Sequence, residues 1–180
     1  MITIGMIHRR FQPFHNGHLD YLRGALGRAK RVIVGVTNPE ARTIFEVSSD
    51  THRHRADANP YPFYIRARMI QESILSCPAC CGRFADVTIV PFPIHTPEVW
   101  LNYIPSVGVV QFMRILDPWD HEKKRTFEAN GYKVEMIEGE RETSGTEIRT
   151  KLGAGEPDWT EKVPEGTRRV LEALSLGLST

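Results

Sequence analysis

The sequence predicts an α/β fold, a doubly wound parallel sheet with helices on both faces. Two observations lead to this prediction: the first 37 residues have the pattern strand, helix, strand, and the same alternation continues to the C-terminus. A strand that returns to its own sheet through a helix pairs in parallel with the preceding strand, by a right-handed crossover. With 180 residues, the chain is expected to form a single domain, residues 1–180, around a Rossmann-like sheet.

The N-terminal unit has the clearest pattern. Residues 1–8 are an apolar and β-branched run, which predicts a buried strand. A helix is expected from Gly17 onward, because apolar residues recur there at helical spacing. Its last turn is predicted to hold three basic residues, Arg28, Lys30 and Arg31. Residues 32–36, all apolar or glycine, predict the second strand.

The rest of the chain continues this rhythm after a long loop. Residues 38–62 have no sustained apolar period and contain three prolines, so we expect an irregular loop. The later elements are predicted as a helix at 63–74, a strand at 86–92, a short helix at 97–104, a strand at 107–116, a helix at 121–129 and a strand at 132–137. In the C-terminal part, from about residue 144, helices are expected at 146–152 and 165–174.

Composition and charge exclude several classes of protein. Lys and Arg total 23 against 22 Asp and Glu, and this balance is unlike that of a protein that binds duplex nucleic acid along a phosphate track. No apolar run approaches the roughly 20 residues that cross a bilayer, and no signal-peptide pattern opens the chain, so a cytoplasmic protein without a membrane partner is expected. Reduced thiols are favoured for Cys77, Cys80 and Cys81 over half a zinc site, because a second ligand pair is missing. Their role is left open.

The loop after the first strand is the first candidate site, since ligands of parallel sheets bind beyond the carboxyl ends of the strands. Asn16 is expected to cap the helix that follows, and Gly17 keeps side-chain bulk away from the helix N-terminus, where backbone N–H groups bind anions. His15 and His18 lie three residues apart, so their imidazoles are predicted to share one face and to bind a phosphate. Arg10 adds a cation nearby. The alternative is that the two histidines only cap the helix or pack locally.

A second helix N-terminus is predicted far downstream. Ser144 and Glu147 satisfy the S-x-x-E capping box, and Gly145 and Thr146 open a helix whose first N–H groups face outward. Capping accounts for Ser144 and Glu147, but it does not account for Arg149 in the first turn. Two helix N-termini with two histidines and two arginines would bind a triphosphate without any net basic charge on the protein.

These two segments resemble motifs of one known family. Residues 10–18, Arg-Phe-Gln-Pro-Phe-His-Asn-Gly-His, are similar to the H-x-G-H signature of the nucleotidyltransferase superfamily, in the form found in archaeal-type nicotinamide-mononucleotide adenylyltransferases. Residues 144–149, Ser-Gly-Thr-Glu-Ile-Arg, resemble the S-G-T-E-[IV]-R motif of the same enzymes. The similarity runs through nearly the whole chain and implies a nucleotidyltransferase-type fold.

The resemblance implies roles for individual residues. His15, His18 and Arg149 would be catalytic. The residues implied in nucleotide binding are Arg10, Phe11, Gln12, Phe14, Gly17, Ser144 and Thr146. In the implied reaction, a phosphate or hydroxyl of the acceptor attacks the α-phosphate of a nucleoside triphosphate in line, and pyrophosphate leaves without a protein nucleophile. Mg²⁺ is expected to accompany the triphosphate, held mainly by phosphate oxygens and water.

Three side chains are candidates for acceptor binding. Trp100 lies where the resembled adenylyltransferases place a tryptophan that stacks on the nicotinamide ring, although Ile104 on the same helix face would equally make it a packing residue. Arg53 and Arg55 belong to a basic cluster that could hold the acceptor phosphate, as could residues 66–68, or that could form a solvated loop.

The chain departs from the resembled family at three places. Arg9 stands where a glycine usually precedes Arg10, and it is expected to add a charge beside the phosphate site. Residues 95–97, His-Thr-Pro, replace the acidic and Asn residues expected before the tryptophan. Residues 116–119, Leu-Asp-Pro-Trp, replace an S-G-N segment after the fourth strand. The two altered loops are expected to reshape the acceptor pocket, so they leave the nucleobase and the acceptor open.

Three functions remain to be separated. The first is adenylyl transfer from ATP to nicotinamide mononucleotide, which makes NAD. The second is CTP-dependent cytidylyl transfer to a small phosphate or phosphonate, and the third is a non-catalytic nucleotide sensor. The catalytic hypotheses share one geometric condition: the segment around residue 146 must lie beside the segment around residue 16. The resembled family is often oligomeric, so a homo-oligomer is compatible with the sequence.

Overall fold

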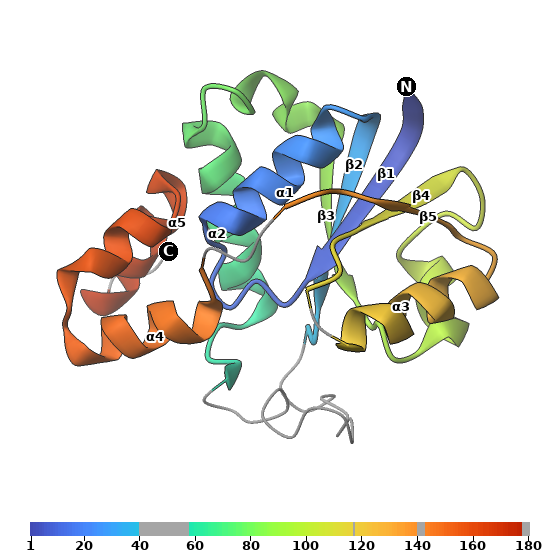
Figure 1. Ribbon diagram of the computed structural model, residues 1–180. Helices are drawn as coiled ribbons and strands as arrows, with labels where there is room; N and C mark the ends of the chain where they lie inside the picture. The colour runs from blue at the N-terminus through green and yellow to red at the C-terminus, as the bar shows by residue number, and fades with distance from the viewer. Residues whose placement is uncertain (40–57, 117, 140–142, 178–180) are drawn as a thin grey trace.

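The computed structural model describes residues 1–39, 58–116, 118–139 and 143–177 (Figure 1). Five parallel strands form one sheet in the order β3-β2-β1-β4-β5. The strands are β1 (Ile2–Arg9), β2 (Ala29–Thr37), β3 (Val87–Phe92), β4 (Val109–Met113) and β5 (Lys133–Met136). The strand order reverses between β1 and β4, and ligands of such sheets bind at that point of reversal.

Helices cover both faces of this sheet (Figure 1). One face carries α1 (Asn16–Leu26) and α2 (Phe63–Ser76), and the other carries the 3-10 helix η4 (Pro97–Asn102) and α3 (Pro118–Ala129). Two neighbouring residues of β1 mark the two faces. Ile7 belongs to the apolar cluster of α1 and α2, whereas Met6 belongs to a second cluster with Trp100 and Phe127. The predicted Rossmann-like α/β fold is confirmed.

The C-terminal helices follow one another along the chain, and the last of them packs against α2. They are α4 (Gly145–Ala154), the 3-10 helix η5 (Pro157–Lys162) and α5 (Glu165–Ser175). The approach of α5 to α2 is close, because a Cβ added to Gly166 would lie 2.0 Å from the carbonyl carbon of Glu72. Beside it, the buried hydroxyls of Ser73 and Thr167 are hydrogen-bonded at 2.9 Å between their oxygens. This packing holds the C-terminal part of the chain beside the sheet.

Several predicted boundaries differ from the structure. Helix α1 ends at Leu26, and Gly27 is its C-cap, so Lys30 and Arg31 lie exposed in β2 instead of in the last helical turn. Only Arg23 is a basic residue of that turn. The strand predicted at 107–116 is limited to β4, and it cannot begin before Val109 because Gly108 has a φ of +78°, outside the extended region.

The structure also contains short helices that the sequence patterns missed. The helix predicted at 97–104 is the 3-10 helix η4, which ends at Asn102. Two further 3-10 helices, η3 (Cys81–Asp86) and η5, were not predicted. A 3-10 helix of six residues makes few turns, so it leaves little apolar periodicity to detect.

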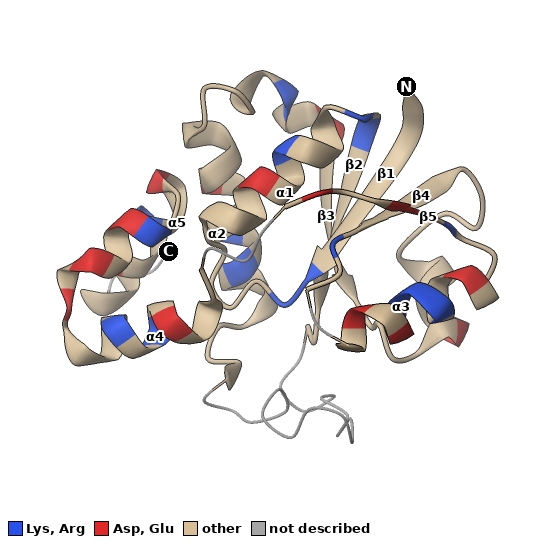
Figure 2. Cartoon of the chain, in the orientation of Figure 1, with Lys and Arg blue, Asp and Glu red and all other residues tan. Residues whose placement is uncertain are grey.

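Basic and acidic residues are mixed on the helices of the protein. Figure 2 shows Lys and Arg interspersed with Asp and Glu along α3, α4 and α5. Among the described residues, no helix combines the length and the apolar character needed to cross a bilayer.

Candidate active site

The loop between β1 and α1 turns at the carboxyl edge of the sheet and is held in place by the chain before α2. Phe11 has a φ of +54°, and the peptide bond between Gln12 and Pro13 is cis. The Gln12 side chain makes two hydrogen bonds with the backbone of Tyr61: its Nε2 donates to the carbonyl oxygen at 2.9 Å, and its Oε1 accepts from the N–H at 3.0 Å. The amide of Gln12 therefore fixes the loop, and it is the backbone of this residue that faces α4.

His15 and His18 lie against each other at the start of α1. Their ring centroids are 3.6 Å apart, and the planes are inclined by 23°. His15 is the N-cap of the helix, so the prediction that Asn16 caps it is wrong; the Asn16 amide instead donates to the carbonyl oxygen of Glu161 at 2.8 Å. The backbone N–H of His15 donates to Nδ1 of His18 at 3.3 Å. Because Nδ1 accepts, the proton of neutral His18 is on Nε2.

The environment of His18 favours its neutral form. Burial lowers its pKa well below the ordinary value of 6.5, and the nearby His15, Arg9 and Arg114 lower it further. Phe11 and Phe14 pack around the ring, with centroids 4.9 and 5.7 Å from that of His18. An anion bound beside the ring would act in the opposite direction, since negative charge raises the pKa of an imidazole.

Phe11, Gln12 and Phe14 therefore support the loop with their side chains. Phe11 is 1% exposed and Phe14 is fully buried. Their role in nucleotide binding stays a prediction. Because these side chains are buried, the backbone of the loop would make the contact. A Cβ on Gly17 would lie 3.3 Å from Cε1 of His15, so a side chain at this position would press on that imidazole ring.

Helix α4 begins with the predicted cap. The Ser144 Oγ accepts a hydrogen bond from the N–H of Glu147 at 3.2 Å. The Glu147 carboxylate forms an ion pair with Lys162, at 2.9 Å between Oε1 and Nζ, and this pair joins α4 to η5. The cap of α4 is therefore as predicted, while the acidic residue of the motif also serves the C-terminal packing.

Arg149 connects α4 to the loop after β1. Its Nη1 donates to the carbonyl oxygen of Gln12 at 2.5 Å, and its Nη2 donates to Oγ1 of Thr146 at 3.2 Å. The helix approaches so closely that a Cβ on Gly145 would lie 2.3 Å from the same Gln12 oxygen. The segment around residue 146 and the segment around residue 16 are thus neighbours, as the sequence-based hypothesis requires.

Arg66 has a structural role, contrary to the suggestion that residues 66–68 hold an acceptor phosphate. It is 1% exposed, and its guanidinium donates to the carbonyl oxygens of Arg10 and Thr37, both at 2.8 Å, and of Asn38 at 2.7 Å. These bonds tie the end of β1 to the end of β2. Arg53 and Arg55 lie outside the described residues.

Arg9 joins the end of β1 to α3. Its Nη1 lies 2.5 Å from Oδ1 of the fully buried Asp120, and its Nη2 donates to the carbonyl oxygen of Arg114 at 2.7 Å. Lys123 pairs with the same carboxylate oxygen, and the N–H of Leu116 donates to Oδ2 at 2.9 Å. Burial tends to raise the pKa of Asp120, but Lys123 and Arg9 outweigh it and hold the pKa well below the usual range. The expectation that Arg9 adds a charge beside the phosphate site stays a prediction: Arg9 is bound to Asp120, and it lies near enough to His18 to lower the pKa of that imidazole.

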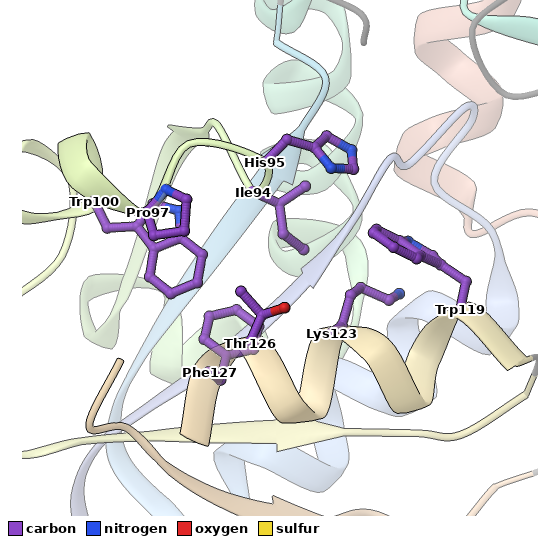
Figure 3. Close-up of a pocket in the computed structure, with 8 residues that line it drawn as sticks. All are labelled: Ile94, His95, Pro97, Trp100, Trp119, Lys123, Thr126 and Phe127. Carbon is purple, nitrogen blue, oxygen red and sulfur yellow. The ribbon is translucent and has the colours of Figure 1, made fainter. Parts of the chain in front are cut away.

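A pocket lies beside Lys123, between the segment that follows β3 and helix α3 (Figure 3). Trp100 forms its inner wall but belongs to the core: it is 1% exposed, and its Nε1 donates to the carbonyl oxygen of Pro93 at 3.0 Å. Its ring packs on Phe127, with centroids 4.8 Å apart. Trp100 is thus a packing residue in this structure, and its stacking on an acceptor stays a prediction.

The cysteines and the acidic residues that the structure describes form no recognisable metal site. In the described ranges, no group of three or more His, Cys, Asp or Glu side chains could hold a metal ion. Cys77, Cys80 and Cys81 are free, with 3.2 Å between the Sγ atoms of Cys77 and Cys80.

The sequence analysis did not single out Asp120 and Lys123. Both lie on α3, where an acidic and a basic residue three apart are an ordinary surface pattern. The usable signal was Arg9, because a guanidinium at the end of a buried strand needs hydrogen-bond acceptors, and a carboxylate is one group that supplies them.

Comparison with known proteins agrees with the geometry. Residues 9–151 match the family described as cytidylyltransferase-like. A phosphonoformate cytidylyltransferase from Streptomyces viridochromogenes is 34% identical over 93% of this chain and 90% of that protein. A nicotinamide-nucleotide adenylyltransferase from Methanococcus aeolicus is 28% identical over 92% of this chain and 86% of that protein.

The fold is also found among solved structures. A bifunctional NMN adenylyltransferase/ADP ribose pyrophosphatase from Francisella tularensis, complexed with AMP and a manganese ion, superposes with a TM-score of 0.60 at 20% sequence identity. The match covers 86% of this chain and 42% of that one, so this chain spans less than half of that protein. At this identity the likeness concerns the fold.

Proposed function

Because the chain belongs to the cytidylyltransferase-like family of nucleotidyltransferases, we propose that it transfers a nucleoside monophosphate from a nucleoside triphosphate to a small phosphate-bearing acceptor and releases pyrophosphate. The observation that carries this proposal is the contact between Arg149 and the carbonyl oxygen of Gln12. It joins the two segments whose helix N-termini and cationic side chains suit a polyphosphate.

The residues at this junction would act by positioning and by charge stabilisation. His18 would donate from Nε2, and Arg149 would donate from its guanidinium to oxygens of the α-phosphate or the leaving pyrophosphate. The N-termini of α1 and α4 would add backbone N–H groups. An oxygen of the acceptor forms the new bond to the α-phosphorus while the bond to the β-phosphate oxygen breaks, and no protein nucleophile takes part.

Mg²⁺ is the proposed companion of the triphosphate. The donor set of the described residues suits phosphates better than a metal ion, so the ion would be held mainly by phosphate oxygens and water. Its chemistry would be to neutralise charge on the phosphates. Since triphosphates complexed with Mg²⁺ are the substrates, the cytoplasm is the proposed compartment.

Two acceptors come into question. Nicotinamide mononucleotide, with ATP as donor and NAD as product, is supported by several relatives named nicotinamide-nucleotide adenylyltransferase, at 25–28% identity. A small phosphonate, with CTP as donor, is supported by the 34% identical phosphonoformate cytidylyltransferase. The altered residues 95–97 and 116–119 also favour this second candidate.

A grid of substrates tests the proposal. ATP, CTP, GTP and UTP are each combined with nicotinamide mononucleotide, phosphonoformate and no acceptor, in the presence of Mg²⁺, and pyrophosphate release is measured. Release with ATP and nicotinamide mononucleotide supports the first candidate, and release with CTP and phosphonoformate supports the second. Nucleotide binding without release for any pair contradicts transfer and favours a nucleotide sensor.

A further inference from the structure

Arg114 lies at the point where the strand order of the sheet reverses. It directly follows β4, and β4 is the neighbour of β1, the strand that leads into the loop with the two histidines. Ligands of open parallel sheets bind at this reversal, beyond the carboxyl ends of the strands. Arg114 belongs to neither of the two sequence motifs. A cationic side chain at this place is therefore a candidate contact for an anionic substrate.

The guanidinium of Arg114 is held at the start of α1. Its Nη1 donates to the carbonyl oxygen of Gly17, the glycine of the H-x-G-H motif, at 3.1 Å. Its Cζ lies over the ring of Tyr21, 5.1 Å from the centroid. The segment after β5 also comes close, because a Cβ on Gly139 would lie 2.4 Å from the same Cζ. The guanidinium is thus packed against both α1 and the chain that leads to α4.

Two of the three guanidinium nitrogens of Arg114 have no partner among the described residues. Nε is buried and makes no hydrogen bond with them, and Nη2 makes none either. The residue is 9% exposed, and Nη2 is not among its buried atoms without a partner. Arg114 therefore offers N–H donors that the described part of the protein does not use, and Nη2 can present them to a ligand.

The charge of Arg114 has no ion pair with a carboxylate among the described residues. Burial lowers the pKa of Arg114, and of the groups that oppose this shift only Asp20 is a carboxylate. Asp20 forms its ion pair with Arg23, at 3.3 Å between Oδ1 and Nη1, and its side chain is 53% exposed, so solvent screens it. A buried guanidinium is stabilised by an anion that binds it. The surroundings of Arg114 thus favour an anionic ligand.

Arg114 and Arg149 bind the same loop at two points. Arg149 donates to the carbonyl oxygen of Gln12, and Arg114 donates to that of Gly17, near the other end of the loop. Burial is the main reason why the pKa of His18 is low, and the charge of Arg114 is near enough to contribute. A polyphosphate bound beside the histidines would therefore have one guanidinium toward each end of this loop.

We propose, building on the nucleotidyl transfer proposed above, that Arg114 is a second guanidinium of the triphosphate site and binds the β- and γ-phosphates, which leave as pyrophosphate. These two groups carry most of the charge of a triphosphate, and an arginine suits phosphate oxygens because its donors are fixed in a plane. Arg114 is then a binding residue for both the donor substrate and the product.

The guanidinium would take part in the reaction without exchanging a proton. The acceptor oxygen forms a bond to the α-phosphorus, and the bond from the α-phosphorus to the bridging oxygen breaks. The bridging oxygen leaves with the electron pair, which adds a negative charge to the pyrophosphate. A donor fixed at the β- and γ-phosphates stabilises this charge. Loss of Arg114 should therefore weaken the binding of triphosphate and pyrophosphate and leave the KM for the acceptor unchanged.

Calorimetric titration with inorganic pyrophosphate and Mg²⁺ tests the contact, because it needs neither an acceptor nor turnover. We expect R114M to raise the Kd of pyrophosphate by about 10- to 100-fold, the usual effect of losing a hydrogen bond to a charged group. R114K keeps the charge and should recover part of the affinity. Arg28 gives a matched control, since its Nη1 donates to the carbonyl oxygen of Gly24 in α1, also at 3.1 Å. R28M should bind pyrophosphate as the wild type does.

A second variant moves the guanidinium and keeps its charge. In G139A, the added Cβ would lie 2.4 Å from Cζ of Arg114, so the end of this flexible side chain must shift. The Kd of pyrophosphate should therefore rise in G139A, by less than in R114M. Melting temperatures show whether both variants fold. If R114M does not, a wild-type Kd in G139A overturns the inference.

Mononucleotides separate the terminal phosphates from the rest of the substrate. AMP and CMP lack the β- and γ-phosphates, so the one that the wild type binds should have the same Kd for R114M. A Kd of this mononucleotide that rises as much as that of pyrophosphate would mean that Arg114 only supports the shape of the site. That result would also overturn the inference.

The outcomes separate this inference from the proposed function. A Kd of pyrophosphate that is unchanged in R114M, or a wild-type protein that does not bind pyrophosphate, removes Arg114 from the triphosphate site even if transfer is observed. A wild-type protein that transfers to no acceptor contradicts the proposed function, whereas a weaker binding of pyrophosphate by R114M would still support the role of Arg114.

Discussion

Arg149 donates a hydrogen bond from Nη1 to the carbonyl oxygen of Gln12 at 2.5 Å, although 137 residues separate the two along the chain. Gly145 makes this approach possible, since a side chain there would collide with the same oxygen. The contact joins the motif at residues 144–149 to the motif at residues 10–18.

The guanidinium of Arg149 should be needed for turnover. We expect Arg149→Ala to lose about 10²–10³ in kcat, the usual cost of removing one donor to the developing charge. Arg149→Lys should recover only a small part, because an ammonium group cannot bind Gln12 and a phosphate with the planar fork of arginine. Arg168, which pairs with Glu165 at the surface of α5, provides a control, and Arg168→Ala should keep wild-type kcat. Wild-type turnover in Arg149→Ala would remove this residue from the mechanism.

The distance between α4 and the loop should matter separately from any charge. Gly145→Ala places a Cβ 2.3 Å from the Gln12 oxygen, so the helix must move away and the KM for the triphosphate should rise. Gly153 lies in the same helix with no atom within 4 Å of its added Cβ. Gly153→Ala should keep the KM and raise stability by up to ~1 kcal/mol, the difference in helix propensity. Steady-state kinetics and urea unfolding of both variants measure the contrast. Equal KM values for the triphosphate in the two variants would mean that triphosphate binding does not depend on the close approach of α4 to the loop.

His18 should contribute to the rate and little to the fold. His18→Ala is expected to lose about 10²–10³ in kcat while the protein remains folded. His18→Asn keeps an N–H donor on a shorter side chain and should retain more activity than alanine. Pyrophosphate release and circular dichroism of both variants provide the measurement. Full turnover of His18→Ala would contradict the proposed chemistry.

Acid should destabilise the protein in a range set by buried histidines. Burial lowers the pKa of His8 and of His18 well below 6.5, so both stay neutral in the folded state while the unfolded chain takes up protons. Their contribution to stability is therefore present above about pH 6.5 and falls as the pH decreases, by up to ~1.4 kcal/mol per pH unit for each group. Asp120, whose pKa is lowered, loses its contribution only in more acidic solution, below about pH 4.

His8→Leu isolates one of these groups. The His8 ring packs on Phe127, with centroids 4.9 Å apart, and among the described residues its buried Nδ1 makes no hydrogen bond. Leucine should therefore be tolerated, and the decrease of unfolding free energy between pH 7 and pH 5 should be less steep than in the wild type, with His18 and His95, whose pKa values are also lowered, accounting for a remaining slope. Urea unfolding at several pH values measures the slope. A slope unchanged by the substitution would assign the acid sensitivity to other groups.

Much of the site could be predicted because its motifs are local. The apolar run of β1, the histidine pair and the cap at Ser144 depend on residues within a few positions of one another, so their spacing defines them. The exact cap of α1 was missed for the opposite reason: Asn16 is the better capping residue by preference, but its amide binds Glu161, which is distant in the chain.

The charged residues around the pocket required the tertiary structure. Arg9 suggested a charge at the phosphates, whereas it is paired with Asp120 on a helix that lies 111 residues further along the chain. Arg66 similarly suggested an anion site, although carbonyl groups at the ends of two strands use its donors. A long flexible side chain can reach several partners, and the sequence does not say which.

The sequence by itself determined the alternating fold, the helix N-terminus with its two histidines and the helix N-terminus with Arg149. Periodicity, capping and motif spacing depend on residues that are close together in the chain. Only the tertiary structure decided that Arg149 reaches Gln12 and that Arg9, Asp120 and Lys123 combine beside one small pocket. The physical reason is that the parallel sheet brings the carboxyl ends of its strands to one edge. There, the partner that a charged side chain binds can come from a segment that is distant in the chain.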